Sequence, residues 1–280
     1  MDFLRLIRPA NCLFAALCVL FGAFYLNRIY FDLSIFSAVL SAGLIAAAGY
    51  VINDFFDIPL DKVNKPYRVL PSGRIKPSSA YLFAVILFII GISCSFATGN
   101  WYCCLIALSN SIMLFYYARY FKLRLLSGNL IVSYTAASTF IFGAICADNL
   151  INIIPVAVMA FLYTLIREII KDAEDIEGDR KFGARTLAVR LERKTSILLT
   201  LLPALALTAF FFLIFHRGLI NLYAYLLLTI FVSLPLLIIL VQLIRNCHSQ
   251  EKFQLASRLI KLDMLILLII IWIGQYHDSL

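Results

Sequence analysis

The chain has 280 residues, of which 62% are hydrophobic and only 14% are charged, and its formal net charge is +8. Soluble domains contain roughly half apolar and about a quarter charged residues, so this composition excludes a water-soluble fold with an ordinary charged surface. The positive charge would suit nucleic acid, but the chain leaves no soluble domain to bind it.

Long uncharged stretches predict helices that cross a membrane, because each crossing needs ~20 mainly apolar residues. One stretch without Lys, Arg, Asp or Glu runs from Pro77 to Ala118. Thr98, Gly99 and Asn100 divide it into two helices. The complete pattern predicts an all-α, polytopic membrane protein with spans at residues 10–27, 34–53, 79–97, 101–118, 129–147, 153–170, 196–215, 220–243 and 262–276.

The basic residues predict how the chain is oriented in a cell membrane. When the connecting segments are assigned to alternate sides, 22 of the 24 Lys and Arg residues fall on one side. Arg28 and Arg217 fall on the other. Because cytoplasmic loops carry an excess of Lys and Arg, the N-terminus and the basic loops should be cytoplasmic and the C-terminus should lie outside.

The first acidic segment follows the second predicted span and contains Asn53, Asp54, Asp57 and Asp61. Three of these residues, Asn53, Asp57 and Asp61, are spaced at i, i+4 and i+8, so they share one face if the helix continues. Pro59 would either kink this helix or begin a new turn.

The second acidic segment follows the sixth predicted span. Glu168, Asp172, Asp175 and Asp179 fall at 0, +4, +7 and +11, which predicts one narrow stripe on a helix. Like charges at i, i+4 destabilise a helix, so the pattern favours cations bound between the carboxylates. Such hard oxygen ligands suit Mg²⁺. A solvated acidic helix end would explain one cluster, but two at corresponding places favour a functional interpretation.

The two acidic segments together predict a diphosphate site. Mg²⁺ usually binds through a few carboxylates together with substrate phosphates. Basic side chains beside the acids would bind the remaining phosphate oxygens and stabilise the charge that develops on a leaving diphosphate. The basic candidates are Lys65, Arg68, Lys122, Arg167 and Lys171.

These motifs resemble those of the UbiA superfamily of intramembrane prenyltransferases over nearly the whole chain. The first family motif, N-D-x-x-D-x-x-x-D, is present as residues 53–61, and the second aspartate motif is present as Asp172, Asp175 and Asp179. Further family-like elements are Arg8-Pro9-x-Asn11, the basic tail at 64–68, Tyr117 with Lys122, and Gly128-Asn129.

The resemblance implies a single transmembrane domain, residues 1–280, with nine helices around a central cavity capped by cytoplasmic loops. The acidic segments each follow an even-numbered span, about four helices apart, which suggests two pseudo-repeated halves, each with an acidic cytoplasmic loop, near 54–76 and 172–194. The cofactor implied by the resemblance is Mg²⁺, and the implied partners are a prenyl diphosphate, a lipid-like or aromatic acceptor, and membrane lipids.

The resemblance further implies roles for individual residues. The prenyl diphosphate would ionise, and the acceptor's nucleophile would attack the allylic cation. Tyr117 would steady this cation through its ring face, and Asn53 would orient the first metal shell or the acceptor. The implied metal and diphosphate residues are Asp54, Asp57, Asp61, Asp172, Asp175 and Asp179.

Within the superfamily, the run from Arg167 to Asp179 is most similar to the archaeal lipid enzymes, the geranylgeranylglyceryl-phosphate geranylgeranyltransferases. That similarity implies transfer of a geranylgeranyl or similar prenyl group to the glycerol hydroxyl of a prenylglyceryl phosphate in ether-lipid synthesis. Aromatic prenyltransferases of quinone and related pathways share E-G-D-x-x-x-G, here residues 177–183, so an aromatic acceptor is the alternative.

Two other classes of membrane protein compete with this interpretation. Transporters commonly carry ionisable residues near the middle of the membrane. Asp263 begins the last predicted span beside Lys261, so we expect it at the interface, and the transporter class is disfavoured. A phosphoryl-transferring or hydrolysing enzyme could use the same carboxylates and Mg²⁺, and only its products would separate it from a prenyltransferase.

Overall fold

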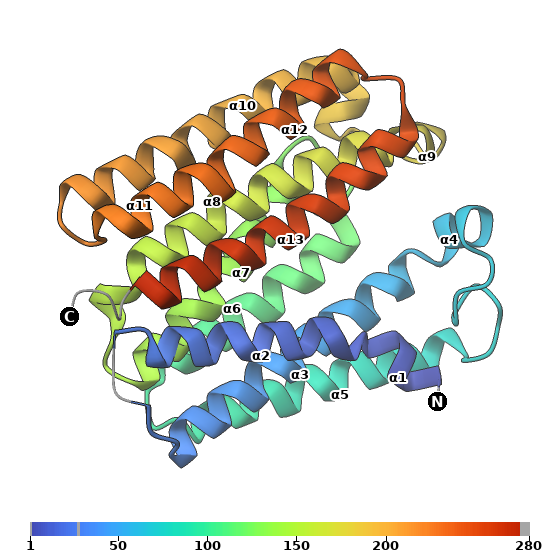
Figure 1. Ribbon diagram of the computed structural model, residues 1–280. Helices are drawn as coiled ribbons and strands as arrows, with labels where there is room; N and C mark the ends of the chain where they lie inside the picture. Colours follow the sequence, from blue (N-terminus) through green and yellow to red (C-terminus); the bar gives the residue numbers. More distant parts are fainter. Residues whose placement is uncertain (1, 27–28, 275–280) are drawn as a thin grey trace. The chain divides into compact units, whose positions relative to one another are not determined.

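The computed structural model describes residues 2–26 and 29–274. Every regular element in these residues is a helix, which confirms the predicted all-α fold (Figure 1). Arg28, the C-terminus and the predicted span limits at residues 27 and 276 lie outside the described residues, so the structure does not bear on them.

The chain forms two compact units. Unit 1 comprises residues 1–122 and 134–157, and unit 2 comprises residues 123–133 and 158–280. Helices α7 (Ser127–Cys146) and α8 (Leu150–Glu174) each contribute to both units. The other elements of unit 1 are α1 (Asp2–Ile7), α2 (Pro9–Phe24), α3 (Leu33–Phe56), α4 (Ile58–Asn64), α5 (Pro77–Phe96), α6 (Trp101–Tyr116) and the π-helix η1 (Tyr117–Phe121).

Unit 2 contains the C-terminal helices. Its elements are α9 (Ile176–Lys181), α10 (Leu187–His216), α11 (Leu222–Leu228), the π-helix η2 (Thr229–Ser233), α12 (Leu234–Arg245) and α13 (Gln250–Gly274). Helix α12 packs against both α10 and α13, and these long helices run side by side in the ribbon view (Figure 1).

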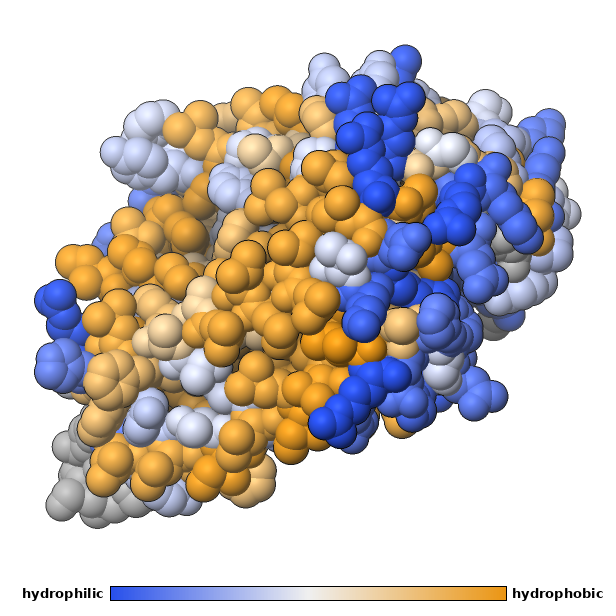
Figure 2. Space-filling model, turned by 90° about the horizontal axis from the view of Figure 1, so that it is seen from above, coloured by the Kyte–Doolittle hydropathy of each residue, from blue (hydrophilic) through white to orange (hydrophobic). Residues whose placement is uncertain are grey.

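Seven helical stretches among the described residues are long and apolar enough to cross a membrane. They are 33–56, 77–96, 101–121, 127–146, 150–174, 187–216 and 222–245. Helix α2 is shorter, and α13 carries more charged residues, so neither belongs to this set. Figure 2 shows a broad area of hydrophobic residues on the visible face, as contact with lipid requires. The protein is therefore a multi-pass membrane protein.

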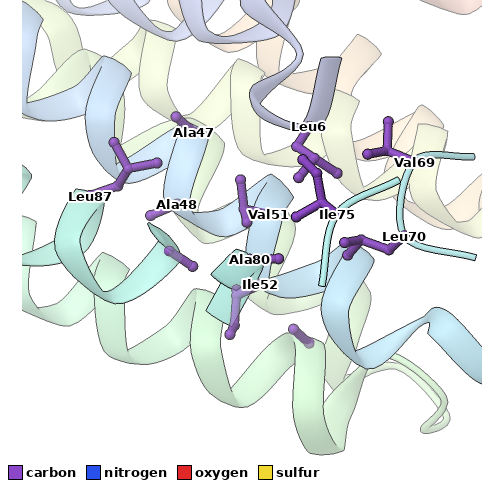
Figure 3. Packing of buried hydrophobic residues seen from close by; sticks show 12 residues of the cluster. Leu6, Ala47, Ala48, Val51, Ile52, Val69, Leu70, Ile75, Ala80 and Leu87 are labelled. Atoms are coloured by element: carbon purple, nitrogen blue, oxygen red, sulfur yellow. The ribbon is translucent and has the colours of Figure 1, made fainter. Parts of the chain in front are cut away.

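One hydrophobic core cluster of unit 1 forms around the contact of α3 with α5 and combines alanines with Leu, Ile and Val side chains. Ala47 and Ala48 of α3 and Ala80 and Ala84 of α5 are buried, and Leu6 of α1 lies in the same cluster (Figure 3). Small residues let helix backbones approach closely, which is how helices associate where lipid removes the hydrophobic driving force.

Helices α2 and α7 approach even more closely through two glycines. A Cβ added at Gly143 would lie 1.8 Å from the Val19 carbonyl oxygen, and one added at Gly22 would lie 2.0 Å from the Phe140 carbonyl oxygen. Neither position can hold a larger residue without moving the backbone.

Asp263 is buried inside unit 2. Helix α13 begins at Gln250, so Asp263 lies in the middle of the helix and is only 5% exposed. Its carboxylate accepts a hydrogen bond from the Tyr163 hydroxyl of α8. Asp263 is therefore a buried residue of unit 2 that joins two helices, and its expected place at the membrane interface stays a prediction.

Candidate functional site

The first acidic segment lies at the junction of α3 and α4. Helix α3 ends at Phe56 and α4 begins at Ile58, yet the backbone hydrogen bonds continue from Asp57 N–H to Asn53 and from Asp61 N–H to Asp57. Pro59 occupies the first turn of α4, where its missing N–H is not needed. The i, i+4 hydrogen bonds therefore continue across the junction, and Pro59 begins a new turn, one of the two roles expected for it.

This junction gathers three buried carboxylates. Asp54, Asp57 and Asp61 are 8%, 8% and 4% exposed, and each offers an oxygen within 4.8 Å of the others. Like charges this close repel strongly at low dielectric. The three carboxylates can stay together only if nearby cations balance their negative charge.

Three basic side chains of unit 1 supply that compensation. Arg8 Nη2 lies 2.5 Å from Asp54 Oδ1, Arg68 Nη1 lies 2.7 Å from Asp61 Oδ2, and Lys122 Nζ bonds to Asp57 Oδ2. These are charge-assisted hydrogen bonds, which are short and strong. Three carboxylates are thus balanced by three cations from separate segments of the chain.

Arg8 reaches the group because of its backbone conformation. It precedes Pro9, and a residue before proline is disfavoured in the right-handed helical region. Arg8 instead adopts a left-handed conformation with φ of 52° between α1 and α2. Its guanidinium then lies 5.0 Å from the ring centroid of Tyr50, one turn before Asp54 on α3.

Lys122 is placed by the π-helix η1. The Lys122 N–H donates to the Tyr117 carbonyl, five residues back, at 2.9 Å. Single π-turns shift the register of a helix and are frequent at functional sites. Here η1 follows α6 directly, and Lys122 at its end bonds to Asp57. Tyr117 itself is partly buried in this turn.

The environment of Arg68 keeps its guanidinium charged. Burial alone would lower the pKa of Arg68, but the hydrogen bond to Asp61 and the charges of Asp61, Asp54 and Asp57 raise the pKa above its usual value. Arg68 is therefore a permanent cation beside the carboxylates. Lys65, from the same segment, is only partly exposed.

Asn53 completes this first group. Its side-chain Nδ2 donates to Asp57 Oδ2 at 2.8 Å, and the same oxygen accepts from Lys122. Two donors on one oxygen hold the Asp57 carboxylate in a defined direction. Residues of unit 1 thus form a polar site in which carboxylates and cations alternate.

The second acidic segment departs from the predicted single stripe. Helix α8 ends at Glu174, the chain bends at Asp175, and α9 begins at Ile176. Asp175 is exposed, whereas Asp172 and Asp179 are partly buried. Among the described residues, the group of carboxylates within 4.8 Å is found in the first segment and not in this one. The role of Asp172, Asp175 and Asp179 as metal ligands therefore stays a prediction.

Within unit 2, Asn129 of α7 fixes one carboxylate of the second segment. Asn129 Nδ2 donates to Asp172 Oδ2 at 2.8 Å, and Asn129 is 5% exposed. This contact is the counterpart of Asn53 with Asp57 in unit 1. In each unit an amide side chain therefore orients an aspartate of the acidic segment.

Arg167 and Lys171 both form ion pairs with Glu168 on the same helix. Arg167 Nη1 is 2.5 Å from Glu168 Oε1, and Lys171 Nζ is 3.7 Å from Glu168 Oε2. Glu168 is only 6% exposed, so its charge needs these partners. The two cations remain candidates for phosphate binding.

Sequence reasoning missed Arg8 and Asn129 as members of the site. Both stood in family-like elements, Arg8-Pro9 and Gly128-Asn129, but neither pattern told which acid it meets. Arg8 is 46 residues from Asp54, and Asn129 is 43 residues from Asp172. Those separations are bridged only by the tertiary fold.

Comparison with known proteins shows the family to which the chain belongs. A model of the UbiA prenyltransferase family matches residues 15–267. The digeranylgeranylglyceryl phosphate synthase of Saccharolobus solfataricus is 39% identical over 248 residues, which cover 85% of this chain and 86% of that protein. The synthase of the same name from Methanopyrus kandleri is 34% identical over 264 residues, covering 94% and 95%.

Solved structures show the same fold. A structure described as digeranylgeranylglyceryl phosphate synthase in membranes is 30% identical, covers 99% of this chain and 98% of its own, and gives a TM-score of 0.83. A UbiA homolog from Archaeoglobus fulgidus bound to DMAPP and Mg²⁺ is 17% identical, covers 95% and 99%, and gives a TM-score of 0.70. The chain belongs to the UbiA prenyltransferase family.

Proposed function

We propose that this protein transfers a geranylgeranyl or similar prenyl group from its diphosphate to the glycerol hydroxyl of a prenylglyceryl phosphate, in a Mg²⁺-dependent step of membrane ether-lipid synthesis. The observation that carries the proposal is the buried group of Asp54, Asp57 and Asp61 with Arg8, Arg68 and Lys122 bonded to it. The names of the related synthases support the choice of acceptor.

The donor set fits Mg²⁺. All three candidate ligands are carboxylate oxygens, which Mg²⁺ prefers, and Mg²⁺ sites commonly use one or two carboxylates and complete their shell with water and substrate phosphates. Bound Mg²⁺ would neutralise the charge that develops on the leaving diphosphate. Asp54, Asp57 and Asp61 would hold it, and Asn53 would keep Asp57 in the required direction.

The basic residues would bind the diphosphate itself. Arg68 and Lys122 already lie against the carboxylates of unit 1 and can donate to phosphate oxygens brought there by the metal. We assign the same role to Lys65, Arg167 and Lys171. Donors fixed before the reaction stabilise the departing diphosphate without rearranging.

The second acidic segment would serve the same substrate. Asp172, Asp175 and Asp179 carry the family's second aspartate motif, and Asn129 orients Asp172. During transfer the bond between the prenyl carbon and the diphosphate oxygen breaks. A new bond forms to the glycerol oxygen, which releases its proton. The ring of Tyr117 would face the intervening allylic cation.

The proposal includes a topology. The chain would cross the membrane nine times around a central cavity, with α2 and α13 as the first and last crossings. The N-terminus and both acidic loops would be cytoplasmic, since nearly all Lys and Arg residues fall in the connecting segments assigned to that side of the membrane. Each half of a single domain would then contribute one acidic loop, near 54–76 and 172–194.

Two other functions predict different products. An aromatic prenyltransferase would use the same diphosphate site and attach the prenyl group to a ring. A phosphohydrolase would release prenyl monophosphate without using an acceptor. The buried Asp263 does not favour a transporter. Its carboxylate accepts a hydrogen bond from the Tyr163 hydroxyl, and this contact explains its burial without a path for a solute.

The test is a product analysis with purified protein, Mg²⁺ and a panel of labelled prenyl diphosphates. One series contains geranylgeranylglyceryl phosphate and a parallel series contains aromatic acids. We expect a doubly prenylated glyceryl phosphate and released diphosphate in the first series. Prenylation of an aromatic acid alone would show that the acceptor class is wrong, and prenyl monophosphate without acceptor use would show hydrolysis.

A further inference from the structure

The last turn of α8 is held by side chains from two other helices of unit 2. The final carbonyls of a helix have no partner within it. The Ala173 carbonyl accepts a hydrogen bond from Arg193 Nε at 2.8 Å, and the Glu174 carbonyl accepts one from Gln250 Nε2 at 2.8 Å. Ala173 and Glu174 are the two residues that separate Asp172 from Asp175.

Arg193 is fixed in this position from several sides. Its Nη2 donates to Gln250 Oε1 at 2.7 Å, its guanidinium carbon lies 5.2 Å from the ring centroid of Phe253, and its Nη2 lies 3.8 Å from Glu177 Oε1. Its side chain is only 11% exposed. A cation at the carboxyl end of a helix also interacts favourably with the helix dipole.

The backbone before Arg193 is strained. Glu192 interrupts α10 with φ of 65° and ψ of 161°, a region that is essentially restricted to glycine. Such a conformation persists only when the surrounding structure enforces it. Glu192 is exposed, and the next residue, Arg193, makes the contacts with the end of α8 described above. The strained conformation therefore lies directly before the residue that binds α8.

The side chain of Glu174 is held by a further contact. Ser257 Oγ of α13 donates to Glu174 Oε2 at 2.5 Å. Helix α13 thus holds both the carbonyl and the carboxylate of Glu174. The bend at Asp175 begins immediately after this anchored residue.

We propose that Arg193 is a positioning residue of the second acidic segment. With Gln250 it fixes the end of α8 and thereby the directions in which Asp172 and Asp175 point, without touching the substrate. This inference rests on the proposed function, because it assumes that the second segment binds Mg²⁺ and diphosphate.

The experiment compares full-length Arg193→Ala with Arg190→Ala. Arg190 is exposed on the same helix, about one turn before Arg193, so the control removes an equal charge. We expect Arg193→Ala to lower kcat about 10- to 100-fold and to raise the Mg²⁺ concentration for half-maximal activity. KM for the acceptor should not change. Arg190→Ala should behave as the wild type.

A second readout does not depend on catalysis. Mg²⁺ with inorganic diphosphate should raise the thermal midpoint of the wild type, because a ligand that binds the folded state stabilises it. Arg193→Ala should need more Mg²⁺ for the same rise. Arg193→Lys can restore one of the two hydrogen bonds and should give an intermediate value, as should Gln250→Ala. A merely structural role would lower the midpoint without moving this Mg²⁺ requirement.

The outcomes separate the two claims. If the wild type is stabilised by Mg²⁺ and diphosphate but transfers no prenyl group, the proposed function fails while the positioning role is still measured by stabilisation. If Arg193→Ala keeps the wild-type kcat and Mg²⁺ requirement, the positioning role is overturned. Should Arg193→Ala not fold, unchanged Mg²⁺ requirements in both Arg193→Lys and Gln250→Ala would overturn it equally.

Discussion

Arg8 connects the N-terminal segment of the chain to the acidic group of unit 1. It bonds to Asp54 and covers the ring of Tyr50 on the same helix. Arg5, one turn earlier, is largely exposed and lies 3.5 Å from Asp2. The two arginines have the same charge and differ in what they touch, so they form a matched pair.

Replacement of Arg8 by alanine should lower the free energy of unfolding by about 1–3 kcal/mol, because Asp54 would lose its closest donor while remaining buried. Arg5→Ala should change it by no more than about 1 kcal/mol, the usual range for an exposed ion pair. Thermal unfolding of both variants in the same detergent checks this. Equal midpoints for the two variants would contradict the role assigned to Arg8.

For individual residues, the sequence predicts which side chains belong to the candidate site but not which side chains they contact. The spacing of Asn53, Asp57 and Asp61 gives their common face, because the hydrogen bonds at the helix junction preserve the period. The contacts of Arg8 and Asn129 depend on segments more than 40 residues away. No local pattern encodes such a pairing, so only the fold reveals it.

Helices α2 and α7 meet closely at two glycines. Gly143 faces the Val19 carbonyl and Gly22 faces the Phe140 carbonyl. Gly43 of α3 is also helical, but an added Cβ there would meet nothing within 4 Å. An alanine at Gly43 changes only the helix propensity, whereas an alanine at Gly143 also collides with a neighbouring backbone. Comparing the two positions therefore isolates the effect of the backbone contact.

Gly143→Ala should destabilise the protein by about 1–3 kcal/mol, because the methyl group forces the two backbones apart. Gly43→Ala should leave the stability unchanged or raise it, since alanine favours a helix over glycine. The measurement is thermal unfolding of the two variants beside the wild type. A Gly143→Ala protein as stable as Gly43→Ala would show that the helices do not meet as described.

Hydropathy predicts where most helices lie, but not where they break. The π-turn at Tyr117–Phe121 and the bend at Asp175 shift the register without changing composition, so no sequence pattern marked them. Helix α13 begins 12 residues before its predicted start, because charged residues between 250 and 261 lower the hydropathy without opposing a helix. The burial of Asp263 against Tyr163 of α8 was therefore not expected from the sequence.

Considered as a whole, the molecule places one acidic segment in each unit. Unit 1 holds Asp54, Asp57 and Asp61, and unit 2 holds Asp172, Asp175 and Asp179. The central claim is that both segments serve one prenyl-transfer reaction. The aspartates of unit 1 are buried and paired with cations, so replacing one of them would also affect stability. Asp175 is exposed, so burial gives it no structural role.

The most direct test is the rate of prenyl transfer by Asp57→Ala and Asp175→Ala, measured beside Glu251→Ala, which removes an exposed carboxylate from α13. Because Asp175 is exposed, its removal should leave the fold intact, so a loss of rate would report on chemistry. We predict that each aspartate variant loses about 100-fold or more of the transfer rate while Glu251→Ala keeps it. Full activity in both aspartate variants would contradict the account.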